Sequence, residues 1–215
     1  MAAVALALTI LGVPVLALQA PFVTSFLVGR AYDPASAGLP PNVALRTAEA
    51  VRVYTTDPRS PRLPAVVGER PGFDESAESH LRDVRRVLTA ARVVTLGCAA
   101  LLALLLALVL PARRYRDIAW VSRAGAVAVA GVTIVAGAAA VIDFEAFFGF
   151  FHGLFFSAGT WTFPPGTLLI ELFPEPVWAA FGGLWAAGVL LLAGSALLAA
   201  RGFSRSARSL EGEDV

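Results

Sequence analysis

Four long stretches of the chain contain no charged residue, and charged residues gather between them. The stretches cover residues 2–29, 93–110, 124–142 and 177–200. Each approaches or exceeds the roughly 18 to 20 apolar residues that a helix needs to cross about 30 Å of hydrocarbon. Hydrophobic residues make up 57% of the sequence, compared with roughly 45–50% in soluble domains. The pattern predicts an all-α membrane protein with four transmembrane helices.

The first stretch is predicted to stay in the protein as a membrane anchor. No basic segment precedes it, and its apolar run is longer than that of a signal peptide. The alanine-rich site near Gln19, where a signal peptide would be cleaved, is followed by Pro21. Since proline inside a helix bends it, a kink is expected at Pro14.

Arginine-rich loops predict which side of the membrane each end of a span faces. Four arginines lie between the second and third stretches, and three follow the fourth; short cytoplasmic loops carry such an excess of basic residues. Both termini are therefore predicted to be cytoplasmic. Within a single membrane domain of residues 1–215, residues 30–92 form an extracytoplasmic insertion, residues 143–176 an outer interfacial aromatic segment with a helix, and residues 201–215 a cytoplasmic tail.

The insertion changes character along its length. Asp33-Pro34 and Leu39-Pro40-Pro41 end the first helix, because proline breaks regular structure. Weak helical spacing follows over residues 44–54, and residues 55–72 contain four prolines, which predicts an irregular loop. From Asp74 onward apolar residues recur at helical intervals, and we expect Asp74 to cap the start of that helix.

Only two histidines occur in the sequence, and each falls near the outer end of a predicted span. His80 projects within the apolar stripe of its predicted helix, so it is expected to point inward. Imidazole exchanges protons near neutral pH, but an inward histidine is also compatible with plain packing. Asp83, one turn later, either hydrogen-bonds the ring or begins the solvated face of the helix.

The second histidine lies in an unusually aromatic connection. Residues 143–176 hold nine of the fourteen phenylalanines, so this segment must lie in the membrane interface or pack against the helices. Helical spacing groups His152 with Phe148, Phe155 and Phe156, with Glu145 two turns earlier. The competing interpretation is an aromatic belt whose histidine faces lipid headgroups.

Because both histidines lie on outer, apolar faces, we predict that they share one pocket at the lipid–water boundary. Apolar walls suit a lipid-like substrate. One neutral imidazole would deprotonate an attacking amine or hydroxyl, while the other would orient it or stabilise developing negative charge. Desolvation is expected to lower the pKa of both rings.

The residues around the histidines also resemble a known family. The matching stretches are Glu78-Ser79-His80-Leu81-Arg82-Asp83-Val84 and Phe151-His152-Gly153-Leu154-Phe155-Phe156, followed by Trp161, Leu169-Ile170 and Phe173-Pro174. They resemble the integral membrane proteins that include the lipoprotein intramolecular transacylases of Gram-positive bacteria, which share the four spans and the large first outer loop. The proline-rich part of the outer loop matches that family less closely.

The resemblance implies an acyltransferase in a bacterial cytoplasmic membrane. An acyl chain would move from the diacylglyceryl group of a lipoprotein onto the amine of its N-terminal cysteine, leaving a lyso-form lipoprotein, with His80 and His152 in the catalytic chemistry. The partners implied are the N-terminus of a bacterial lipoprotein and membrane lipid.

Such a transfer needs orientation, a base and stabilisation of an oxyanion, but no cofactor or metal. The candidates for residues that support the histidines are Asp83, Asp143 and Glu145, and those for the pocket lining are Phe151, Phe155, Trp161 and Phe163. A net charge of +1 gives no support for nucleic-acid binding, and the His-Glu-x-x-His pattern of zinc proteases is absent from the sequence.

Two other classes remain open at this point. The histidines would be axial ligands in a bis-histidine haem membrane protein, which would be coloured and show a Soret band. In a non-enzymatic membrane binding or assembly protein both rings would be structural, and alanine variants that fold would keep the function.

Overall fold

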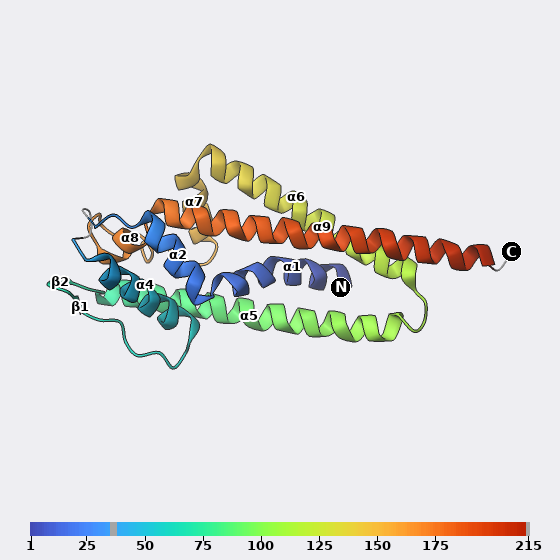
Figure 1. Cartoon of the computed structure of the whole chain (residues 1–215), viewed down its shortest axis with the longest axis horizontal. Helices are drawn as coiled ribbons and strands as arrows, with labels where there is room; N and C mark the ends of the chain where they lie inside the picture. Colours follow the sequence, from blue (N-terminus) through green and yellow to red (C-terminus); the bar gives the residue numbers. More distant parts are fainter. Residues whose placement is uncertain (35–37, 214–215) are drawn as a thin grey trace. The chain divides into compact units, whose positions relative to one another are not determined.

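The computed structural model describes residues 1–34 and 38–213, with side chains to residue 210, and it is mostly helical. Residues 214–215 of the predicted cytoplasmic tail lie outside the described residues. The helices are α1 (Ala2–Leu18), α2 (Pro21–Ala31), α4 (Pro41–Thr56), α5 (Glu75–Val109), α6 (Tyr115–Ile142), α7 (Phe144–Gly153), α8 (Leu168–Leu172) and α9 (Glu175–Glu213), and the strands are β1 (Val66–Val67) and β2 (Arg70–Pro71) (Figure 1).

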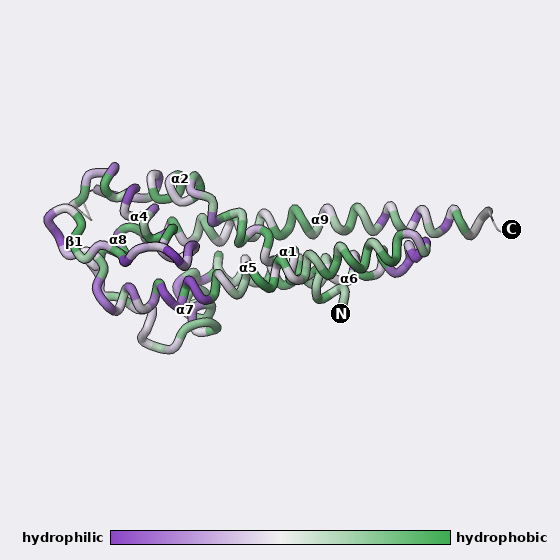
Figure 2. Tube along the Cα trace, turned by 90° about the horizontal axis from the view of Figure 1, so that it is seen from below, coloured by the Kyte–Doolittle hydropathy of each residue, from purple (hydrophilic) through white to green (hydrophobic). Residues whose placement is uncertain are grey.

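Three of the described helices, α5, α6 and α9, are long and apolar enough to cross a membrane. The pair α1 and α2 passes the same test only together, as a span bent by 68°. Hydrophobic residues follow the second half of α5, whereas hydrophilic residues gather in its first half and in α4 (Figure 2). The prediction of a helical membrane protein is confirmed, with three candidate spans, or four if the bent pair counts as one.

The sharp bend of the first predicted span lies before Pro21 rather than at Pro14. Pro14 sits inside α1, which continues to Leu18. Ala20 has an extended backbone with ψ 138° and precedes Pro21, the first residue of α2. Proline disfavours helical geometry in the residue before it but fits the first position of a new helix. The chain therefore stops one helix and starts another within two residues.

The insertion after α2 contains more order than its sequence predicts. Helix α4 packs against α2 and is longer than the weak periodicity indicates. Within the predicted irregular loop, β1 and β2 form a small antiparallel hairpin that pairs Val67 with Arg70, and Gly68 takes a positive φ of 63° in its turn. The predicted cap of α5 is confirmed, since the Asp74 carboxylate accepts a hydrogen bond from the Ala77 amide at 2.8 Å.

The chain divides into two compact units. The first comprises Met1–Leu16, Ala91–Ala138 and Trp185–Val215. Its buried core includes Ile10, Ala126 and Val189. The Trp185 indole donates to the Leu11 carbonyl at 3.0 Å. Small residues allow close packing here, because a Cβ added at Gly12 would lie 1.8 Å from the Thr95 hydroxyl oxygen.

The second unit comprises Ala17–Ala90 and Ala139–Leu184, and it contains both histidines. Its core draws on α2, α4, the hairpin region, α8 and the first turns of α5 and α9. Arg85 of α5 fastens that helix to the end of α4. Its guanidinium donates to the Tyr54 carbonyl and the Ser60 hydroxyl and lies 4.1 Å from the centre of the Tyr54 ring.

Candidate active site

The two histidines lie side by side in the second unit. Their ring centres are 6.3 Å apart and their planes differ by 30°. Each residue is only 8% exposed, so the predicted inward orientation of His80 is confirmed. Residues separated by more than seventy positions in the sequence, one on α5 and one on α7, therefore form a single buried pair.

Helix α7 sets the orientation of His152. Asp143 caps the helix by accepting a hydrogen bond from the Ala146 amide at 2.9 Å. One turn before the histidine, the carbonyl oxygen of Phe148 lies 2.9 Å from His152 Nδ1. A carbonyl can only accept a hydrogen bond, so Nδ1 carries the proton. The lone pair of the neutral ring then resides on Nε2, and this nitrogen is the basic one.

Aromatic side chains surround the pair. The rings whose centres lie within 6 Å of either imidazole belong to Phe148, Phe151, Phe156, Trp161 and Phe163. The nearest to His152 is Phe148 at 3.9 Å. Phe156 contacts both imidazoles, at 4.9 Å from His80 and 5.6 Å from His152. The histidines thus occupy an apolar, aromatic environment.

Both histidines lie outside the uncharged stretches that are predicted to cross the membrane. Their aromatic environment lowers the pKa of both rings. The pKa of His80 is lowered to about 4, chiefly by burial and also by the neighbouring His152, while Asp83 opposes the shift. Burial also lowers the pKa of His152, while its hydrogen bond to the Phe148 carbonyl opposes the shift. Both rings are consequently neutral near pH 7, as the sequence analysis predicts.

Two buried polar atoms of this cluster have no hydrogen-bond partner among the described residues. One is Nδ1 of His80 and the other is the indole nitrogen of Trp161. Buried polar groups in native proteins are nearly always paired. These two atoms are therefore available to a molecule that enters the site.

The carboxylates predicted to support the histidines take other positions. Asp83 pairs with Arg86 at 2.7 Å on the more exposed side of α5, so it begins the solvated face and reaches His80 only through its charge. Asp143 acts as the cap of α7, and Glu145 is exposed in the first turn of that helix.

The predicted lining residues mostly gather at the pair. Phe151, Trp161 and Phe163 each contact a histidine ring. Phe155 is 50% exposed and contacts Phe151 at 5.2 Å rather than an imidazole. Helix α7 ends at Gly153, so Phe155 lies beyond the helical face on which the sequence spacing places it.

Phe148 and Phe156 contribute more to the site than their sequence positions indicate. The Phe148 carbonyl fixes the His152 tautomer, and the position four residues before a helical histidine is the signal that identifies it. Phe156 lies against both imidazoles, so a planar macrocycle between the rings would have to displace it. The arrangement does not fit a bis-histidine haem. Among the described residues, no group of three or more His, Cys, Asp or Glu side chains is placed to hold a metal ion.

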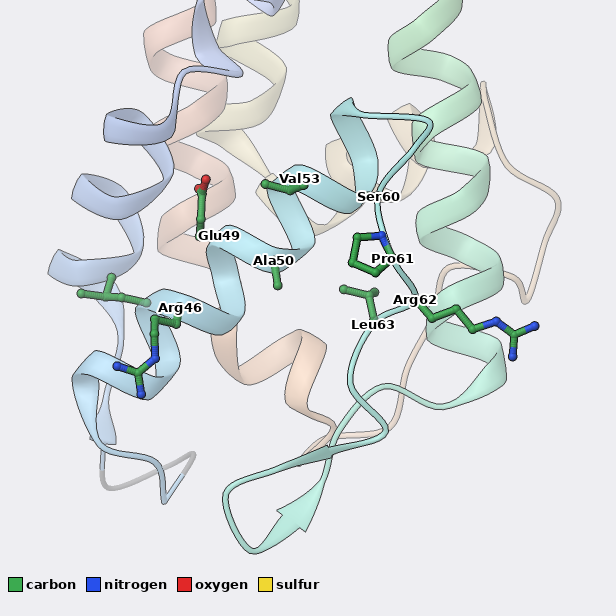
Figure 3. A pocket seen from close by; sticks show the side chains of 9 residues that line it. Arg46, Glu49, Ala50, Val53, Ser60, Pro61, Arg62 and Leu63 are labelled. Carbon is green, nitrogen blue, oxygen red and sulfur yellow. The ribbon is translucent and has the colours of Figure 1, made fainter.

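An apolar groove elsewhere in the second unit contains neither histidine. It has a volume of about 520 Å³ and lies between α4 and the irregular segment 60–63 (Figure 3). Its only carboxylate, Glu49, is paired with Arg52. The groove therefore lacks the titratable groups that the histidine pair provides.

Comparison with known proteins gives one family and one fold. The family model of the lipoprotein intramolecular transacylase Lit matches residues 3–178. No curated protein matches the chain. The chain is similar to the solved structure of the membrane integral lipoprotein intramolecular transacylase Lit from Bacillus cereus, with 17% identity and a TM-score of 0.79 over 97% of this chain and 94% of that chain.

Two variants of the Bacillus cereus protein are similar as well. A structure in which a histidine is replaced by arginine has 16% identity and a TM-score of 0.76 over 97% of this chain and 91% of that chain. A structure with alanine at that histidine has 17% identity and a TM-score of 0.71 over 98% and 92% of the two chains. At these identities the structural matches show the fold.

Proposed function

Because the chain belongs to the family of the lipoprotein intramolecular transacylase Lit, a family of membrane enzymes, we propose that it moves an acyl chain within a diacylglyceryl lipoprotein. The acyl group would leave a glyceryl ester and join the amine of the N-terminal cysteine, giving the lyso-form lipoprotein. The observation that carries the proposal is the buried pair of neutral histidines among aromatic side chains. Such aromatic surroundings suit acyl chains, and a neutral histidine supplies a base without a cofactor.

We assign the role of general base to His152. Its Nδ1 proton is held by the Phe148 carbonyl, which leaves Nε2 free to accept a proton from the attacking amine. The same carbonyl stabilises the imidazolium that forms, and this stabilisation opposes the effect of burial on the pKa. His80 lacks such support and has a pKa of about 4, so it is the weaker proton acceptor of the two.

His80 is assigned to orient the amine. At pH 7 its neutral ring has one nitrogen that accepts a hydrogen bond, and its buried Nδ1 has no partner among the described residues. A neutral amine has one N–H for His152 and a second N–H for His80. Sharing the two N–H groups in this way would aim the nitrogen lone pair at the ester carbonyl.

The aromatic side chains Phe151, Phe155, Trp161 and Phe163 are assigned to the acyl chains. Phe151 and Phe155 are 45% and 50% exposed, which supports a role for them at the lipid-facing entrance. Asp143 would act by holding α7, and hence His152, in place. Asp83 would act on His80 through its charge, and Glu145 would act through its position in the first turn of α7. We place the site on the outer face of a bacterial membrane, where the substrate lipoprotein would be exposed. Both termini are then cytoplasmic.

The test is made in bacteria that produce diacylated lipoproteins. The wild-type chain, His80→Ala and His152→Ala are expressed at matched levels, and N-terminal lipopeptides are identified by mass spectrometry. Wild type should yield lyso-form peptides with an N-acyl group, and the variants should yield diacyl peptides. Unchanged diacyl peptides with folded wild-type protein would contradict the proposed reaction.

A further inference from the structure

The indole nitrogen of Trp161 is a buried donor with no partner among the described residues. An indole N–H can only donate a hydrogen bond, and burying it unpaired is unfavourable. The ring lies against α7, with its centre 4.9 Å from that of His152 and 6.4 Å from that of Phe148. A Cβ added at Gly149 would lie 3.8 Å from the far edge of the indole. One face of α7 thus holds the indole beside the proposed base.

Packing alone does not explain a tryptophan at this position. The other carbocyclic rings around the histidines are phenylalanines, which fill apolar space without an unpaired donor. Elsewhere in the described chain, the indole of Trp185 donates to the Leu11 carbonyl at 3.0 Å. The unpaired donor of Trp161 occurs in the same cluster as the unpaired Nδ1 of His80. Since buried polar groups are nearly always paired, both atoms are candidates to pair with a polar group of a substrate.

We propose that the Trp161 indole N–H donates a hydrogen bond to the carbonyl oxygen of the ester that is being transferred, and that it stabilises the oxyanion formed during transfer. This inference rests on the proposed transacylase function. A neutral donor in a water-poor, aromatic site is effective because it is already oriented before charge develops. His80 and His152 are then free to handle the two N–H groups of the amine.

The step balances without a further reactant. The amine nitrogen attacks the ester carbonyl carbon and forms a C–N bond, and the carbonyl electron pair moves to the oxygen that Trp161 contacts. His152 Nε2 takes one amine proton. The intermediate then collapses, the C–O bond to the glyceryl group breaks, and the leaving oxygen takes the proton from His152. The products are an amide and a free glyceryl hydroxyl.

The test removes the N–H while keeping the ring. Position 161 is changed to phenylalanine in one variant and to 3-benzothienylalanine in another, whose sulfur replaces the N–H in a fused ring of nearly the same shape. Trp178→Phe is the matched control, because Trp178 also contacts Phe148, at 6.0 Å. Each protein is purified in detergent, and N-acyl formation on a diacylglyceryl lipopeptide with a free N-terminal cysteine is followed by mass spectrometry over a range of lipopeptide concentrations.

Both changes at position 161 should lower kcat about 100-fold, as the loss of one oxyanion donor does in other enzymes, while KM changes little. Trp178→Phe should keep the wild-type kcat. A benzothienylalanine variant with wild-type kcat would overturn the inference, and so would a loss confined to KM, since that pattern indicates packing of the acyl chain.

A second measurement separates this inference from the proposed function. The indole N–H signals of protein labelled with ¹⁵N on its tryptophans are recorded with and without an N-acetylated diacyl lipopeptide, which cannot accept an acyl chain. One signal, absent from Trp161→Phe, should move downfield when the lipopeptide binds. An unmoved signal in the presence of bound lipopeptide overturns the donor role. Absence of N-acyl product with wild type would instead contradict the transacylase activity, whatever the indole signal does.

Discussion

Replacing the two histidines should affect the rate of acyl transfer unequally, because the surroundings of the two rings differ. His152→Ala removes the nitrogen that the Phe148 carbonyl prepares as a base. A positioned general base raises the rate of a reaction about 10²- to 10⁴-fold. This corresponds to about 3–5 kcal/mol of activation free energy, at about 1.36 kcal/mol per tenfold change in rate. His80→Ala leaves one buried polar group of the substrate unpaired, which costs about 1–3 kcal/mol and corresponds to roughly 5- to 150-fold. We therefore expect the larger loss of kcat for His152→Ala.

The assay uses purified protein in detergent with a synthetic diacylglyceryl lipopeptide, and it reports initial rates of N-acyl product. Thermal unfolding of each variant checks that the protein is folded. Added imidazole provides a further control, because it fits the space that His152→Ala opens among the phenylalanines and should restore part of the rate. The same additive should restore less in His80→Ala, where the lost ring does not carry the proton.

A larger loss of kcat in His80→Ala than in His152→Ala would refute the assignment of the base. Rescue by imidazole in His80→Ala alone would lead to the same conclusion. Equal losses with no rescue in either variant would indicate that the two rings act as one unit, against the separate roles argued from the Phe148 hydrogen bond.

Three further predictions concern the elements that hold the site. Asp143→Ala removes the cap of α7 and should lower stability by about 1 kcal/mol, seen as a lower Tm together with a lower kcat. Arg85→Ala loses the bonds to the end of α4 and should cost about 1.5–3 kcal/mol, whereas the exposed control Arg82→Ala should keep the wild-type Tm. The pKa of His80 is lowered to about 4 in the folded protein, so between pH 6.5 and 4 the unfolded chain binds more protons than the folded one, and stability falls as pH falls through this window. The wild-type Tm should therefore be lower at pH 5 than at pH 7.5. If that difference does not shrink in His80→Gln, the prediction is contradicted.

Much of the helical framework follows directly from the sequence. Three of the uncharged stretches fall within longer helices, α5, α6 and α9, that are apolar enough to cross a membrane. Asp74 caps α5 as its residue type and position predict, and the apolar stripe of that helix correctly places His80 inside. These features depend on neighbours within a few residues or on one helical face, which the sequence displays.

Other features depend on contacts that local patterns do not contain. The sharp bend occurs before Pro21 and not at Pro14, because the residue preceding Pro21 leaves helical geometry entirely. The hairpin between β1 and β2 is fastened to α8 by the ion pair of Arg70 with Glu171, a contact between distant parts of the chain. The carboxylates near the histidines form local pairs and caps instead of reaching the rings, and sequence proximity does not distinguish these outcomes.

The hydrogen bond between His152 and the Phe148 carbonyl has a consequence for how the site tolerates mutation. Its acceptor is a main-chain atom, so every residue type at position 148 offers the same oxygen. Substitutions there change the aromatic wall but leave the proton of the imidazole where it is, provided that α7 stays helical. Substitution of residue 148 during evolution would thus alter the fit of the proposed acyl substrate independently of the choice of tautomer. The aromatic wall beside His152 and the tautomer of its imidazole are thus encoded in separate parts of the same residue.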